Sequence, residues 1–164
     1  MIGMDRKRWA FLLQVVDRPG AMTSIASAFS NEGVNLETVA GHGSDGGEEG
    51  WILVTFSSSE AEKEKMARKI RRLSKVRRME ELPYGSRRLC RFAVVRSLRE
   101  LSPAEMGEEE VLVRRIREEG GEGWIYLLAG PREEVDPVLQ RLKGAGLLAS
   151  LVHTLLAPGS GPQI

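Results

Sequence analysis

The chain has 164 residues, of which 41% are hydrophobic, 29% charged and 5% aromatic, and its formal net charge is +1. This composition is typical of a folded globular protein and excludes an intrinsically disordered chain. Because the charge is nearly balanced and aromatic residues are few, we expect no nucleic acid among its partners.

Cysteine content and terminal sequence indicate the compartment. A single cysteine, Cys90, excludes an internal disulfide framework and is typical of a reducing environment. Residues 1–8 lack the apolar segment of a signal peptide, and no run of about 18 apolar residues is present to span a membrane. We therefore expect a cytoplasmic protein without membrane contact, organised as one domain or two small ones.

The first half of the chain alternates predicted strands and helices. Residues 9–16 are apolar except for Gln14, which predicts a strand covered on both faces. Asp17 or Arg18 is expected to end this strand and start a helix cap, with Pro19 in the first helical turn. The helix is predicted to stop at Gly33 and to bury a stripe formed by Met22, Ile25, Ala26 and Phe29.

Four more elements complete this half. Alternation over residues 34–40 and the β-branched and aromatic run 51–56 predict two strands, joined by a glycine-rich hairpin loop at 41–50. A helix is predicted after Ser59, with acidic residues early and basic residues late, followed by a strand at 76–82. The order βαββαβ predicts a two-layer α+β sandwich of the ferredoxin-like type.

The second half contains a similar set of elements. Strands are predicted at 89–95, 124–129 and 147–156, and a helix at 132–143. Ser102 and Pro103 are typical of a helix start, but residues 104–119 leave two alternatives open: one long helix, or a short helix followed by a strand through 111–113.

A short internal repeat relates the two halves. The segment GEEGWIL at 47–53 recurs as GEGWIYL at 121–127, and a polar helix and a strand follow in both cases. We therefore predict a first domain at 1–83, a second, degenerate domain of the same type at 84–157, and a disordered tail at 158–164. The second domain lacks the turn that follows the first strand of the first domain.

That turn is the main candidate binding site. Residues 17–22 lead from a strand directly into a helix, whose first backbone N–H groups attract an anion such as a carboxylate. Asp17 is able to pair with an ammonium group, and the Asn35 amide both donates and accepts hydrogen bonds. A zwitterionic amino acid needs this combination of groups. The alternative is a turn with a purely structural role.

Other chemistry has less support. His42 and His153 are the only histidines and have no metal-ligand spacing, so we expect no metal site and no cofactor. Cys90 is interpreted as a strand residue rather than a nucleophile, because no local motif positions a base beside it. The glycines at 46, 47 and 50 do not form a phosphate loop. We therefore expect no catalytic residue.

With these motifs in place, the chain resembles the regulatory small subunit of acetolactate synthase, also called acetohydroxyacid synthase. Asp17-Arg18-Pro19-Gly20-Ala21-Met22 stands where that family has Asn-x-x-Gly-Ala-Leu. Residues 29–37, FSNEGVNLE, are similar to its Phe-Ser-x-Arg-Gly-Tyr-Asn-Ile-Glu segment. The length, the strand at 88–95 and the Leu128-Ala129-Gly130 turn also agree with the family.

The resemblance implies an N-terminal ACT domain, followed by an ACT-like domain, in a chain without an active site. It implies a homodimer through the ACT domains that binds valine or a related amino acid at the interface. Feedback inhibition would then be transmitted to a thiamine-diphosphate-dependent catalytic large subunit. The effector-binding residues it implies are Asp17, Arg18, Pro19, Gly20, Ala21, Met22, Val34, Asn35 and Leu36.

One departure supports an alternative. Asp17 occupies the family's asparagine position, and Asp-Arg-Pro-Gly is more similar to ACT domains at large. The alternative is a free-standing tandem-ACT amino-acid sensor similar to the glycine-cleavage repressor. An acylphosphatase-like enzyme has the same element order but requires an Arg- and Asn-containing phosphate loop, which does not follow the first strand here.

Overall fold

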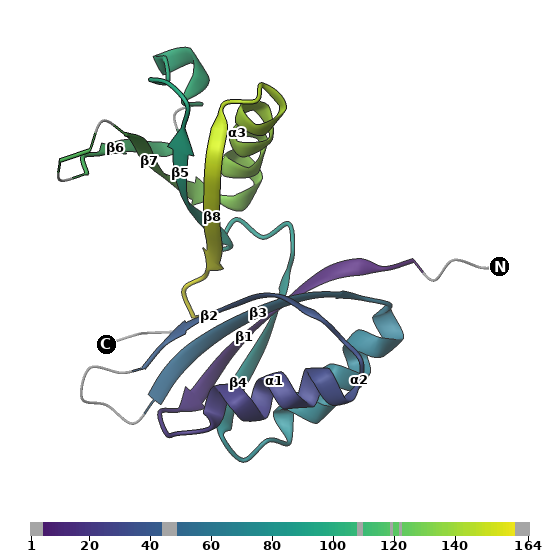
Figure 1. The fold of residues 1–164 in the computed structure, drawn as a ribbon. Coiled ribbons are helices and arrows are strands. Elements are labelled where there is room, and N and C mark those ends of the chain that lie inside the picture. The colour runs from purple at the N-terminus through teal and green to yellow at the C-terminus, as the bar shows by residue number, and fades with distance from the viewer. Residues whose placement is uncertain (1–4, 44–48, 108–109, 119, 122, 160–164) are drawn as a thin grey trace. The chain divides into compact units, whose positions relative to one another are not determined.

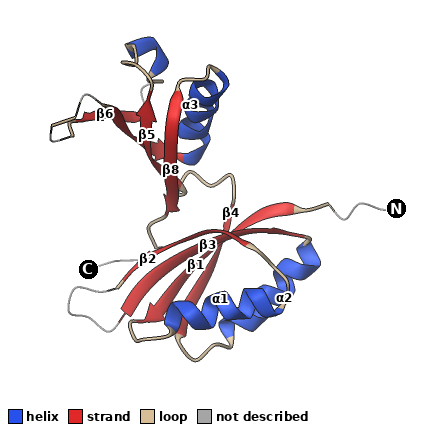
Figure 2. Cartoon of the chain, in the orientation of Figure 1, coloured by secondary structure: helices blue, strands red, loops and turns tan. Residues whose placement is uncertain are grey.

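The computed structural model describes residues 5–43, 49–107, 110–118, 120–121 and 123–159. The chain forms two compact units, and the boundary between them lies between Tyr84 and Gly85. Each unit contains one four-stranded antiparallel sheet (Figures 1 and 2). No helix in the described part of the chain is long and apolar enough to cross a bilayer.

The first unit confirms the predicted βαββαβ order. Its sheet has the strand order β2-β3-β1-β4, and both helices cover one face of it (Figure 2). The elements are β1 (Lys7–Val16), α1 (Ala21–Asn31), β2 (Leu36–His42), β3 (Glu49–Ser58), α2 (Glu60–Arg71) and β4 (Val76–Pro83).

Alternate residues of β1 build the core beneath the helices. Phe11 and Val15 are buried there, and the Phe11 ring meets the Phe56 ring edge-on at a centroid distance of 4.9 Å. Phe29 brings α1 into the same cluster, with its ring centroid 5.0 Å from that of Phe56. Aromatic residues bury large apolar areas, so this cluster fixes α1 against the sheet.

The start of α1 differs from the prediction. The N-cap is Gly20, with φ of 86°, and the helix begins at Ala21. Asp17 and Arg18 do not start the cap, and Pro19 lies before the first helical turn, because residues 16–21 form a separate turn. In that turn the Arg18 N–H donates to the Val16 carbonyl at 2.9 Å, and the Ala21 N–H donates to the Arg18 carbonyl at 3.3 Å.

The buried stripe of α1 differs accordingly. Its buried residues are Ala21, Ile25, Ala28 and Phe29. The prediction that Met22 belongs to this stripe is wrong, since Met22 is 48% exposed. Ala21 is the buried residue of the first turn, and Met22 lies about 100° around the helix from it.

The end of α1 and the start of α2 agree with the prediction. Gly33 follows the helix with φ of 68°, the left-handed conformation expected of a terminating glycine. Ser59 caps α2, where its hydroxyl accepts from the Glu62 N–H and the Glu62 carboxylate accepts from the Ser59 N–H. The predicted hairpin loop at 41–50 is shorter, because β2 extends to His42 and β3 begins at Glu49; residues 44–48 lie outside the described residues.

The second unit has a sheet of order β6-β7-β5-β8, the same arrangement as in the first unit. In the described residues of this segment, a short 3₁₀ turn, η1, stands in the place of the first helix. The elements are β5 (Cys90–Ser97), η1 (Pro103–Glu105), β6 (Leu112–Ile116), β7 (Trp124–Pro131), α3 (Arg132–Gly144) and β8 (Leu148–Leu156).

This result decides between the alternatives for residues 104–119. The segment contains a short helical turn and then a strand, because Gly107 has φ of 94° and ends the turn. Helix α3 then covers the sheet with Val135, Val138, Leu139 and Leu142. The predicted disordered tail falls mostly on residues 160–164, which lie outside the described residues.

Candidate functional site

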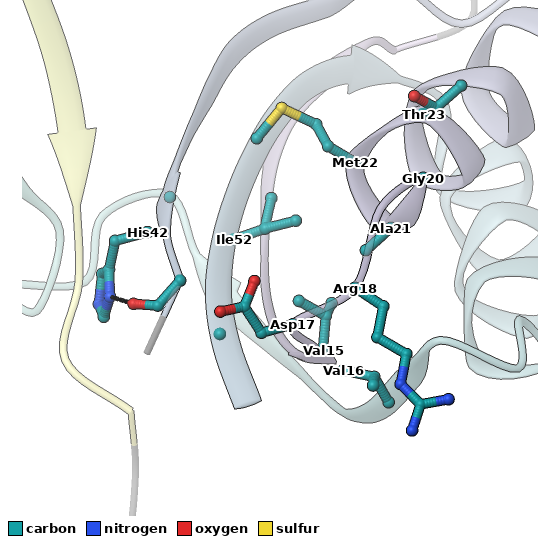
Figure 3. Close-up of a pocket in the computed structure, with 13 residues that line it drawn as sticks. Val15, Val16, Asp17, Arg18, Gly20, Ala21, Met22, Thr23, His42 and Ile52 are labelled. Carbon is teal, nitrogen blue, oxygen red and sulfur yellow. Dashed lines mark hydrogen bonds between the residues drawn. The ribbon is translucent and has the colours of Figure 1, made fainter. Parts of the chain in front are cut away.

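A cleft of about 270 Å³ lies in the first unit, between the end of β1, the start of α1 and the facing ends of β2 and β3 (Figure 3). Backbone and apolar side chains form much of its wall. The lining residues are Val15, Val16, Asp17, Arg18, Gly20, Ala21, Met22, Thr23, Gly41, His42, Gly43, Gly50 and Ile52.

Asp17 supplies the carboxylate of the cleft. It directly follows β1, and it lies against the backbone of Gly43, where an added Cβ would be 2.6 Å and 3.0 Å from the two carboxylate oxygens. His42 lies beside Gly43, and its Nδ1 hydrogen-bonds to the Gly43 carbonyl at 2.6 Å while its ring points away from Asp17 (Figure 3). The hairpin therefore approaches Asp17 with glycine backbone rather than with a side chain.

The opposite wall is the first turn of α1. The N–H groups of Met22 and Thr23 have no partner within the helix, because the carbonyl groups that would accept them belong to residues before Gly20. The helix dipole adds a partial positive charge at the same end. The cleft therefore offers a carboxylate from Asp17 and amide donors from α1 within one space.

Lys75 supports this turn from outside the cleft. Its Nζ donates to the Pro19 carbonyl at 2.9 Å, and its own carbonyl accepts from the Val16 N–H at 2.9 Å. An added Cβ on Gly20 would lie 2.7 Å from the Lys75 Nζ.

Five of the nine predicted site residues line the cleft: Asp17, Arg18, Gly20, Ala21 and Met22. The Arg18 guanidinium points away from Asp17 (Figure 3). Pro19 belongs to the turn and contributes its carbonyl to Lys75.

The other three predicted residues lie beyond the far end of α1. Val34 is buried in the core, Leu36 packs against that core, and Asn35 is exposed. The cleft within one chain therefore does not include Asn35. The sequence pattern also missed His42, Gly43, Gly50 and Ile52, because these residues reach the cleft through the pairing of β3 with β1 and with β2.

The single cysteine and the two histidines are all strand residues. Among the residues that the structure describes, no three His, Cys, Asp or Glu side chains are grouped so as to hold a metal ion. Cys90 is a partly buried residue of β5. His153 lies on β8 with its Nδ1 3.0 Å from Arg91 Nη1, and burial, together with the Arg91 charge, lowers its pKa.

Comparison with known proteins identifies the first unit. Residues 11–78 match the family model described as an AHAS small subunit-like ACT domain, where AHAS is acetohydroxyacid synthase. These residues form an ACT domain of the acetohydroxyacid synthase small-subunit type. The match spans both walls of the cleft and confirms the resemblance drawn from residues 17–37.

Solved structures extend the likeness in fold to the whole chain. The acetolactate synthase small subunit from Thermotoga maritima superimposes with a TM-score of 0.69 at 13% identity, covering 94% of this chain and 99% of that one. Both units therefore have the fold of that small subunit. A search of curated proteins by sequence finds no match.

Two further structures are more distant. The regulatory subunit of aspartate kinase from Thermus thermophilus has a TM-score of 0.48 at 12% identity, covering 87% of this chain and 93% of that one. A putative glycine cleavage system transcriptional repressor has a TM-score of 0.41 at 13% identity, covering 94% of this chain and 99% of that one. Neither value is high enough to favour one relative's role.

Proposed function

We propose that this chain is a non-catalytic regulatory subunit of acetolactate synthase in branched-chain amino-acid biosynthesis. In this proposal it binds valine or a related amino acid and imposes feedback inhibition on a thiamine-diphosphate-dependent catalytic subunit. The observation that supports it most is the cleft itself, which combines the Asp17 carboxylate with the amide donors at the start of α1.

The chemistry of the cleft suits a zwitterion with an apolar side chain. Asp17 would pair with the α-ammonium group, and the first N–H groups of α1 would take the α-carboxylate. Val15, Met22 and Ile52 supply apolar lining for the side chain. Removing apolar area from water contributes roughly 25 cal/mol per Å², so these residues favour an aliphatic over a polar effector.

A homodimer would complete the site in this proposal. Strand β2 is at the edge of its sheet, where backbone groups remain available to pair with another chain. Val34, Asn35 and Leu36 immediately precede or begin this strand. We propose that these residues of a second protomer approach the cleft, so that the Asn35 amide meets the bound effector.

A thermal-shift screen of the twenty standard amino acids tests the binding proposal. A ligand at ~100 times its dissociation constant stabilises the folded state by ~2.7 kcal/mol, which is readily detected. We expect valine or another branched aliphatic amino acid to give the largest increase in melting temperature. If no amino acid raises the melting temperature of the full chain, the proposal is wrong.

The alternative is a free-standing amino-acid sensor, favoured by aspartate rather than asparagine at position 17. Co-purification distinguishes the two functions, because only a regulatory subunit forms a stable complex with a thiamine-dependent catalytic subunit. We expect the tagged chain to retain such a subunit from its native cells and to make its activity sensitive to the effector. Amino-acid binding without any such complex would favour the sensor.

A further inference from the structure

We infer that Lys75 is a positioning residue of the proposed amino-acid site. The inference rests on the proposed function, and it concerns a residue that neither the sequence pattern nor the cleft lining includes. Lys75 precedes β4, and its hydrogen bonds reach the turn between β1 and α1 from outside the cleft.

Two hydrogen bonds hold this turn at both of its ends. The Lys75 carbonyl accepts from the Val16 N–H, where β1 stops, and the Lys75 Nζ donates to the Pro19 carbonyl, next to the N-cap of α1. Both donor–acceptor distances are 2.9 Å, within the range of a well-formed hydrogen bond. The residues between these two contacts include Asp17, so one lysine fixes the segment that carries the site carboxylate.

The contact with Pro19 also fixes a peptide plane. In a trans peptide the C=O and the following N–H point in opposite directions. Since the Pro19 carbonyl points to Lys75, the Gly20 N–H points away from it. Gly20 lines the cleft and Lys75 does not. Lys75 therefore orients the Gly20 amide as a donor on the cleft side, beside the N–H groups of Met22 and Thr23.

Lys75 also limits the residue at position 20. With φ of 86°, Gly20 has a conformation that side chains rarely adopt. A Cβ at position 20 would lie 2.7 Å from the Lys75 ammonium. A side chain at this position would therefore displace the ammonium from the Pro19 carbonyl. The two positions are therefore expected to be coupled in their effect on binding.

Three variants of the full chain test the inference. Lys75→Met removes the ammonium and retains most of the side-chain volume, Lys75→Arg retains a cationic donor, and Arg77→Met removes one positive charge from the neighbouring strand β4. Binding is measured by calorimetry with L-valine and with L-valinamide, or with the same pair for whichever amino acid gives the largest thermal shift. The amide lacks the carboxylate that the oriented N–H groups are inferred to bind.

We expect Lys75→Met to weaken binding of the amino acid about tenfold, the effect of one hydrogen bond to a charged group. Binding of the amide is expected to weaken much less, because it makes little use of those donors. Lys75→Arg should restore most of the affinity, and Arg77→Met should leave the ratio of the two affinities unchanged.

Each result that contradicts the inference identifies a different error. If the wild-type chain binds no amino acid, both the proposed function and the role of Lys75 are wrong. If the wild type binds but Lys75→Met binds equally well, the function stands and the positioning role is wrong. If Lys75→Met weakens the amino acid and the amide equally, Lys75 acts only through the stability of the turn, and the inferred orientation of the donors is overturned.

Discussion

The carboxylate of Asp17 lies directly against the backbone of Gly43, with no room for a side chain between them. A Cβ on Gly43 would be 2.6 Å from Asp17 Oδ2, closer than real Cβ atoms approach any heavy atom. Asp17 follows β1 and Gly43 follows β2, so this contact joins the turn before α1 to the hairpin. A side chain at position 43 would therefore displace the Asp17 carboxylate.

Gly43→Ala is expected to weaken amino-acid binding while the fold persists. The added methyl group displaces the Asp17 carboxylate, which is the flexible end of a side chain and moves at low cost. We expect a loss of about tenfold in affinity, since a charge-assisted hydrogen bond is worth ~1.5–3 kcal/mol. Calorimetry and thermal melting measure the two effects.

Gly85→Ala is the matched control for this variant. Nothing lies within 4 Å of a Cβ added to Gly85, and its φ is not positive. Its affinity for the amino acid should equal that of the wild type. Equal affinities for all three proteins would show that the position of Asp17 does not matter to binding.

A comparison of Gly20→Ala with Gly33→Ala separates the effect of backbone strain on stability from the effect of the site on amino-acid affinity. Both glycines have positive φ, and they flank the two ends of α1. Each variant should lose ~1–2 kcal/mol of unfolding free energy, the cost of placing a side chain in the left-handed conformation. Only Gly20→Ala should also lose amino-acid affinity, because nothing lies within 4 Å of a Cβ at position 33. Parallel losses of affinity would place the effector away from the start of α1.

Strand and helix positions were predictable where the burial pattern was strong. Residues 9–16 and 51–56 are apolar runs, and both proved to be strands that pair with each other along their length. The start of α1 was misplaced because a proline in the first turn is only a preference, whereas Gly20 sets the boundary by its positive φ. The sequence placed Asp17 and Gly20 in one turn because they are three residues apart, and both line the cleft.

The other residues around the cleft come together through contacts between segments that are far apart in the sequence. Gly43 and Ile52 reach the cleft through strand pairing, and Lys75 reaches the turn through a side chain from beyond α2. No local pattern encodes those approaches. The sequence pattern also could not predict the length of the short η1 turn in the second unit. Ser102 and Pro103 are equally typical of the start of a long helix and of a single turn.

Ser59→Ala is expected to destabilise the first unit by ~1 kcal/mol, the usual cost of losing an N-cap side chain. The Ser59 hydroxyl accepts from the Glu62 N–H at 3.2 Å, and the variant leaves that donor without its cap. For a unit of this size the melting temperature should fall by roughly 4–8 °C. Ser27→Ala, at an exposed position within α1, is the control and should change it little. An unchanged melting temperature for Ser59→Ala would show that the capping box contributes nothing.

Glu32 links the two helices in a pH-dependent manner. Hydrogen bonds from Lys65 at 2.5 Å and Lys69 at 2.8 Å lower the pKa of its carboxyl from 4.5 to about 2. Since the folded-state pKa is depressed, the contribution to stability is complete above about pH 4.5 and is lost as the pH falls toward 2.

The variant Glu32→Gln tests this linkage by thermal melting at several pH values. Its melting temperature should lie below that of the wild type at pH 6, and the difference should shrink between pH 4.5 and 2. A difference that stays constant over this range would mean that the ion pairs with Lys65 and Lys69 do not set the pKa of Glu32.

Calorimetric titration of the Gly20→Asp variant with the amino acid that binds the wild type tests the central claim most directly. The new side chain would start 2.7 Å from the Lys75 ammonium at the N-cap of α1, and its carboxylate would compete for this cation and repel an effector carboxylate proposed to bind at the neighbouring N–H groups. We expect saturable binding by the wild type and by Gly33→Ala, and no measurable binding by a Gly20→Asp chain that still melts cooperatively. Binding by Gly20→Asp with the affinity of the wild type would contradict this claim.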